Sequence, residues 1–170
     1  LFTSSNARYE LLYPVADSNS LDNRPDPITV TTRSPQLLFL AHANPSGVSV
    51  TKSISGGKTV ATIGQDTVIY NPAGTSYTQG SISGNAKLFA QRTGGALIFK
   101  ATTAAGSQYG ISCGVPVNMS VKARKASIYV YGTGTHTVTV TSPYGTDSWS
   151  IEAGTTQSRT LSGRSIGKPV

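Results

Sequence analysis

Short runs in which hydrophobic and polar residues alternate make up most of this chain. Examples are ITVTTR, KTVATI, DTVIY, SIYVYG and THTVTVTS, separated by turn clusters such as NPSG, SGGK, NPAGT and SPYGTD. A two-residue period bounded by Gly, Pro and Asn is typical of β-strands, and no segment keeps the 3.6-residue period of a helix. The pattern predicts an all-β protein, an antiparallel, jelly-roll-like β-sandwich of about 10–12 short strands.

The same period predicts which side chains share a face. In SIYVYG it places Ile128 and Val130 on one face and Tyr129 and Tyr131 on the other, and in THTVTVTS it separates the valines from the threonines. The runs ALIFK and QLLFL are continuously apolar instead. We therefore expect these two runs to be central strands that are covered on both faces.

The first residues have a different pattern. In LFTSSNARYELLYPVAD a short helix-like feature is closed by Pro14, and the following DSNSLDNRPDPI has the composition of a loop. We expect residues 1–27 to form an irregular or extended lead-in with a polar loop, and residues 28–170 to form a single β-sandwich domain. A chain of 170 residues suits one domain with its own core.

The polar loop also contains oxygen ligands of the kind that Ca²⁺ prefers. The carboxylates are those of Asp17, Asp22 and Asp26. An EF-hand pattern is not followed, because Leu21 stands at its fifth position. Two interpretations remain, a polar loop with Asx turns and a structural calcium site, and no other cofactor is expected.

Charge is sparse and mostly positive. Only 12% of residues are charged, the formal net charge is +7, and four of the seven acids lie within the first 26 residues. Residues 27–170 contain only three acids, Asp66, Asp147 and Glu152. The positive charge of residues 27–170 attracts polyanions, but charge alone does not distinguish acidic polysaccharide, nucleic acid and an anionic surface as the partner.

Most catalytic and metal chemistries lack their residues here. The two histidines are His42 and His136, no G-x-S-x-G motif is present, and one cysteine excludes an internal disulfide and the usual zinc spacings. The three acids of residues 27–170 each adjoin a turn, where carboxylates ordinarily face solvent. SISGGKT lacks the first glycine of a phosphate-binding loop and is better explained as a hairpin turn. We assign no catalytic residue.

Aromatic and cationic residues gather instead in VKARKASIYVYG and in the segments after it. Rings of Tyr and Trp suit recognition surfaces, and Lys and Arg bind carboxylates. A structural interpretation stands beside this one, since the rings also suit packing and the cations also protect an edge strand. The candidate ligand-binding residues are Tyr129, Tyr131, Tyr144, Trp149, Lys122, Arg124 and Lys125.

The closing stretch GTHTVTVTSPYGTDSWSIEAGTTQSRTLSG places a strand, an aromatic-bearing turn and a last pair of strands around EAGT one after another. In this order, and in its Gly/Ser/Thr-rich strands, the chain resembles the β-sandwich carbohydrate-binding modules and accessory domains of bacterial polysaccharide-degrading enzymes, including polysaccharide lyases. The resemblance implies a secreted protein, a catalytic domain in the same parent chain, and sugar binding through aromatic side chains.

Together, charge and resemblance predict a non-catalytic module that binds an anionic, uronate-containing polysaccharide. One alternative is a structural domain of an adhesin, viral capsid or fibre, and a second is a polysaccharide lyase fragment. Nucleic acid is not an expected partner. No run of 18 apolar residues could span a membrane, so no membrane partner is expected.

Overall fold

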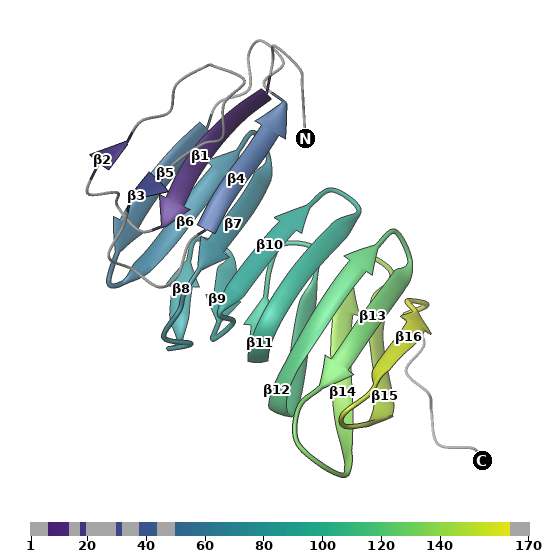
Figure 1. The fold of residues 1–170 in the computed structure, drawn as a ribbon. Helices are drawn as coiled ribbons and strands as arrows, with labels where there is room; N and C mark the ends of the chain where they lie inside the picture. The colour runs from purple at the N-terminus through teal and green to yellow at the C-terminus, as the bar shows by residue number, and fades with distance from the viewer. Residues whose placement is uncertain (1–6, 14–17, 20–29, 32–37, 44–49, 164–170) are drawn as a thin grey trace, which may run out of the picture.

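The structure, a computed structural model, describes residues 7–13, 18–19, 30–31, 38–43 and 50–163, with side chains from residue 51 onward (Figure 1). All the regular elements in these ranges are strands, which confirms the predicted all-β class. The sixteen strands are β1 (Ala7–Tyr13), β2 (Ser18–Asn19), β3 (Val30–Thr31), β4 (Leu38–Ala43), β5 (Val50–Ser55), β6 (Lys58–Ile63), β7 (Asp66–Tyr70), β8 (Tyr77–Gln79), β9 (Ile82–Gly84), β10 (Leu88–Arg92), β11 (Gly95–Ala105), β12 (Gly110–Lys122), β13 (Lys125–Val130), β14 (Thr135–Ser142), β15 (Gly145–Glu152) and β16 (Thr156–Thr160).

Twelve of these strands form one antiparallel sheet with branches. Its main path runs β15-β14-β12-β11-β10-β7-β6-β5, while β13 and β16 extend from β12, and β9 and β8 extend from β11. The lead-in strands β1 and β2 pair with β4 and β3, which follow the lead-in. The lead-in is therefore extended over residues 7–13.

The branching arises because β11 and β12 are long and change partners along their length. Residues 117–122 of β12 pair with β13, whereas residues 110–112 pair with β14. In the same way, residues 95–99 of β11 pair with β10, and residues 104–105 pair with β9. Each long strand thus belongs to two groups of strands, and the buried side chains of both groups form a single hydrophobic cluster. Sandwich packing remains a prediction.

The core confirms the predicted alternation in β13 and β14. Ile128 and Val130 are fully buried while Tyr129 and Tyr131 are half-buried, and both valines of THTVTVTS are fully buried beside mainly exposed threonines. Burying one such aliphatic side chain stabilises a fold by about 1.5–3 kcal/mol. The largest fully buried side chains include Tyr109, Phe89, Ile69, Ile98, Met119, Ile128, Ile151 and Leu161.

The predicted hairpin turn in SISGGKT is also confirmed. Ser55 pairs with Lys58 across a two-residue turn, and Gly56 and Gly57 both have positive φ, at 56° and 75°. Two successive left-handed residues are what a type I′ hairpin turn requires, and glycine adopts them without steric cost.

One prediction about strand coverage is wrong. Leu97 and Phe99, in the run ALIFK, are 43% and 39% exposed, so β11 is covered on one face only. On its other face Leu97 and Phe99 lie beside the half-buried Leu88 and Ala90 of β10 and the exposed Ser120 of β12. The side chains of QLLFL lie outside the described residues. None of the described residues forms a helix long and apolar enough to cross a membrane.

Candidate functional site

A β-bulge in the middle of β11 shapes its exposed face. The register between β11 and β12 is broken between Ile98 and Ala101, and Lys100 has a φ of +48°, in the left-handed region. Ile98 and Ala101 are fully buried, while the two residues between them, Phe99 and Lys100, are both exposed. A regular strand would send one of these two side chains into the core. The bulge therefore presents a ring and an ammonium group together.

Asn118 on β12 connects this bulge to β13. Its Oδ1 accepts a hydrogen bond from the backbone N–H of Lys100 at 2.9 Å, and its Nδ2 donates to the hydroxyl of Tyr131, also at 2.9 Å. Asn118 stands opposite Tyr129 in the β12–β13 ladder. The side chain of Asn118 thus holds both the backbone of Lys100 on β11 and the ring of Tyr131, which follows β13.

Three aromatic rings and one cation complete the cluster. The rings of Tyr129 and Tyr131 meet edge to face, with centroids 4.8 Å apart and an interplanar angle of 79°. Nζ of Lys100 lies 5.3 Å from the centroid of Tyr131 and 6.0 Å from that of Phe99. We call Phe99, Lys100, Asn118, Tyr129 and Tyr131 the bulge platform. It offers ring surfaces for stacking and, in Lys100 and Asn118, groups that bond oxygen atoms.

The other candidate cations lie at the opposite end of β13. Lys122 and Lys125 face each other across the turn between β12 and β13. By strand alternation Lys125 is on the same face as Tyr129, and about 20 Å of strand separates Lys125 from Tyr131. Lys122 and Lys125 therefore lie at one end of this sheet face, and Tyr131 lies at the other end.

Arg124 and Tyr144 come from two different turns and meet at this second end. The guanidinium carbon of Arg124 lies 4.1 Å from the centroid of the Tyr144 ring, and Tyr144 is 37% exposed. The backbone carbonyl of Arg124 also accepts a hydrogen bond from the N–H of Leu161 at 2.7 Å. Tyr144 is thus paired with a cation from the neighbouring turn and does not belong to the bulge platform.

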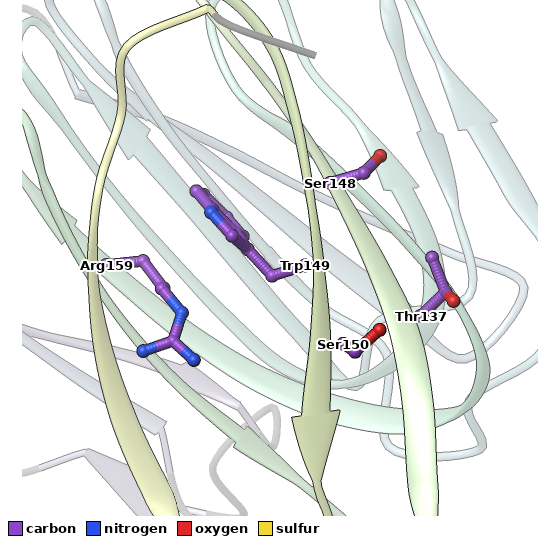
Figure 2. A pocket seen from close by; sticks show the side chains of 5 residues that line it. All are labelled: Thr137, Ser148, Trp149, Ser150 and Arg159. Carbon is purple, nitrogen blue, oxygen red and sulfur yellow. The ribbon is translucent and has the colours of Figure 1, made fainter. Parts of the chain in front are cut away.

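Trp149 lines a separate, shallow groove of about 480 Å³ (Figure 2). Its half-buried side chain packs against the core and points from β15 toward Arg159 of β16, whereas Ser148 points to the opposite side of β15. The guanidinium of Arg159 donates to the carbonyl of Ser158 at 3.1 Å and to the side-chain oxygen of Gln157. The lining residues are Thr137, Ser148, Trp149, Ser150 and Arg159.

We expected the three acids of residues 27–170 to face solvent, and this prediction is wrong for Asp147. Asp147 is 1% exposed, and its carboxylate accepts hydrogen bonds from the N–H of Ser162 at 3.0 Å, the hydroxyl of Ser162 at 2.9 Å and the N–H of Gly163 at 3.0 Å. The strand alternation of β15 turns Asp147 inward, next to the segment that follows β16. It anchors that segment to the β14–β15 hairpin.

The remaining candidates carry less information. Nε2 of His136 lies 2.9 Å from the carbonyl oxygen of Thr133, in the loop before its own strand. Asp17, Asp22 and Asp26 lie outside the described residues. Among the residues that the structure describes, no three His, Cys, Asp or Glu side chains are grouped so that they could hold a metal ion.

Sequence reasoning missed three members of the bulge platform, namely Phe99, Lys100 and Asn118. The continuously apolar run ALIFK predicts a strand covered on both faces, and a bulge formed without glycine leaves no signal in such a run. Comparison with known proteins adds nothing to this site, since no family model, no curated protein and no solved structure matches the chain.

Proposed function

We propose that this chain is a non-catalytic carbohydrate-binding module for an anionic, uronate-containing polysaccharide, and that the bulge platform is its binding site. The observation that carries the proposal is the bulge itself, because it places Phe99 and Lys100 on the exposed face beside Tyr129 and Tyr131. In the proposal the protein is secreted, and a catalytic domain of the same parent chain acts on the bound polymer.

The chemistry of the bulge platform supports a sugar ligand. Tyrosine and phenylalanine rings offer flat apolar surfaces against which the C–H faces of a sugar ring pack. The amide of Asn118 and the hydroxyl of Tyr131 supply donors and acceptors for sugar hydroxyls beside those rings. Lys100 makes two cation–π contacts and no ion pair within residues 51–163, so its ammonium group remains able to bind a ligand carboxylate.

The second end of the same sheet face supports a polymeric ligand. Lys122 and Lys125 lie about 20 Å along β13 from Tyr131. A chain of acidic sugars that stacks on the bulge platform can therefore extend along β13 and bring later carboxylates to these lysines. A single sugar could engage only one end of this face.

The expected affinity is modest and sensitive to salt. The cations involved are exposed, and exposed charges are screened beyond about 8 Å at physiological ionic strength. Such binding makes or breaks no bond. Its effect is to hold the polymer near the attached catalytic domain, which raises the effective concentration of substrate there.

Affinity electrophoresis in native gels tests the proposal. The gels contain a neutral glycan, a uronate polymer or no polymer, and we expect retardation only with the uronate polymer. Phe99→Ala and Tyr131→Ala should restore free mobility. Leu97→Ala is the matched control, since Leu97 is as exposed as Phe99, lies two residues away on the same strand and has no ring.

A second pair of variants separates specific binding from the general attraction of a basic protein. Lys100→Ala and Lys58→Ala each remove one positive charge, but only Lys100 belongs to the bulge platform. We expect a larger loss of retardation for Lys100→Ala. Equal losses in both variants, or equal mobility of the wild type in all gels, would sink the proposal. Ligand-free oligomers at micromolar concentration would point to the structural alternative.

A further inference from the structure

The strand β15 is an edge strand whose middle, residues 148–150, carries none of the usual protection against pairing. Within the described residues it pairs only with β14, in an unbroken register from Thr135↔Glu152 to Ser142↔Gly145. Its eight residues, GTDSWSIE, include no proline, lysine or arginine, and its two acids, the buried Asp147 and the exposed Glu152, lie outside residues 148–150. Natural edge strands commonly carry a lysine, a proline or a bulge, or are very short, because their free N–H and C=O groups can pair with another chain.

The hairpin turn fixes which backbone groups point outward. Ser142 and Gly145 close a two-residue turn, so they exchange both hydrogen bonds, and every second pair along the ladder does the same. Trp149 therefore bonds to β14 through its backbone. The N–H and C=O groups of Ser148 and Ser150 point to the free edge.

The groove beside Trp149 lies against the middle of β15. Its lining includes three consecutive residues, Ser148, Trp149 and Ser150. Because consecutive side chains of a strand point to opposite faces, Ser148 and Ser150 share one face with Thr137 of β14, while Trp149 is on the other face. Arg159 of β16 lines the same groove, on the side toward which Trp149 points (Figure 2).

We propose that the free edge of β15 binds an extended acidic peptide as an added strand. The peptide backbone pairs with the N–H and C=O groups of Ser148 and Ser150, as in other cases of strand addition. A peptide residue opposite Trp149 lies on the face of the Trp149 ring, and a carboxylate there reaches the guanidinium of Arg159. This site is independent of the bulge platform and of the proposed sugar ligand.

Charge selects this occupant over a second copy of the chain. Within residues 51–163 Arg159 bonds neutral oxygen atoms of Gln157 and Ser158 and no carboxylate. Two copies paired through β15 would bring both Arg159 side chains to one interface between chains of net charge +7 each. An acidic peptide instead supplies the missing counter-charge and increases the rate of encounter with a basic protein.

Two blocked octapeptides are the probes, one alternating Thr and Glu and one alternating Thr and Lys. Trp149 is the only tryptophan of the chain, so its fluorescence reports on this groove alone. We expect the Thr-Glu peptide to change its emission saturably and the Thr-Lys peptide to leave it unchanged. Arg159→Gln should weaken Thr-Glu binding roughly tenfold or more, as for loss of a hydrogen bond to a charged group.

Ser150→Pro and Ser150→Ala form a matched pair. Proline removes the outward N–H without touching the β14–β15 ladder, a position that edge strands tolerate, whereas alanine removes only the hydroxyl. We expect Ser150→Pro to bind the Thr-Glu peptide roughly five times more weakly than Ser150→Ala does, as for one hydrogen bond. Amide hydrogen exchange of the wild-type protein gives the same test without a mutation, because the outward amides of Ser148 and Ser150 should gain protection when the Thr-Glu peptide binds, whereas the amide of Trp149, which bonds to β14, should not.

Four results would overturn the inference. The first two are that both peptides bind equally well, or that the two Ser150 variants bind the Thr-Glu peptide with equal affinity. The third is that the Thr-Glu peptide adds no protection to the amides of Ser148 and Ser150. The fourth is that these amides are protected instead by concentration-dependent dimerisation or by a uronate polymer. The last result would assign the edge to a second copy of the chain or to the polysaccharide.

Discussion

Lys100 donates its backbone N–H to the side-chain oxygen of Asn118 over 2.9 Å, and this bond holds the only left-handed residue within β11. A left-handed conformation costs a residue with a side chain about 1–2 kcal/mol. The hydrogen bond offsets about 1 kcal/mol of this cost, and the cation–π contact with Tyr131 offsets a further 0.5–1 kcal/mol or so. The strain is thus balanced by contacts made within the bulge platform.

The variant Lys100→Gly separates stability from binding. Glycine adopts positive φ without strain but loses more entropy on folding, so we expect the free energy of unfolding to change by less than about 1 kcal/mol. Uronate binding should fall markedly, because the ammonium group beside Tyr131 is gone. Urea unfolding and affinity electrophoresis measure the two effects.

Ala123→Gly is the matched control for the backbone effect. Among the described residues, Lys100 and Ala123 are the two non-glycine residues with positive φ. Ala123 has a φ of 52° and lies in the turn between β12 and β13. We expect a similar small change in stability and an unchanged affinity for the uronate polymer. Loss of binding in Ala123→Gly would show that backbone changes in this sheet, rather than the ammonium group of Lys100, control the affinity.

Tyr131→Phe tests whether the position of the ring matters. The variant keeps the ring and removes the hydroxyl to which Asn118 donates at 2.9 Å. We expect a loss of about 1 kcal/mol in the free energy of unfolding, since Nδ2 of Asn118 loses this partner. Binding should weaken by less than in Tyr131→Ala. If Tyr131→Phe binds as poorly as Tyr131→Ala, the hydroxyl contacts the sugar directly and the ring does not carry the affinity.

Asp147 offers a test of the end of the domain. Its buried carboxylate is the acceptor for three donors of Ser162 and Gly163. Asp147→Ala removes all three of these hydrogen bonds, and we expect a loss of about 3 kcal/mol or more, whereas Asp147→Asn keeps one oxygen acceptor and should lose less. Thermal unfolding of the two variants measures the difference. Equal stabilities of both variants and the wild type would show that the segment after β16 does not depend on this anchor.

The sequence predicted the elements of the fold better than the geometry of the site. Alternation in SIYVYG identified the buried Ile128 and the outward Tyr129 correctly, because the two-residue period depends on neighbours in the chain. Turn chemistry identified the Gly56–Gly57 hairpin for the same reason. Both features are local.

The bulge platform depends on register between strands, which local patterns do not encode. Asn118 is 18 residues from Lys100 in sequence, yet its side chain fixes the bulge that exposes Phe99. Asp147 adjoins a turn, but the partners that bury it are 15 and 16 residues away. Within VKARKASIYVYG the local pattern identified the outward Tyr129, but Arg124 lies in the turn between β12 and β13, and the grouping of the candidates into separate sites needed the long-range pairing.

Tyr77 carries the last prediction, through pH. Its hydroxyl is buried with no hydrogen-bond partner among the described residues, and burial raises the pKa of Tyr77 to about 12. The folded protein thus retains a proton between pH 10 and 12 that the unfolded chain loses. Stability from this group is complete below pH 10 and falls as pH rises toward 12, with a slope of at most about 1.4 kcal/mol per pH unit.

Tyr77→Phe should remove this part of the alkaline loss. It also removes an unsatisfied buried hydroxyl, so we expect the free energy of unfolding at neutral pH to stay equal or to rise by about 1 kcal/mol. Burial, with a contribution from Tyr144, raises the pKa of Tyr109 too, so some pH dependence persists in the variant. Urea unfolding from pH 8 to 11.5 measures the slope, with the half-exposed Tyr129→Phe as control. A slope in Tyr77→Phe as steep as in the wild type would contradict the assignment, because the buried Tyr77 hydroxyl is then not the group that loses its proton on unfolding.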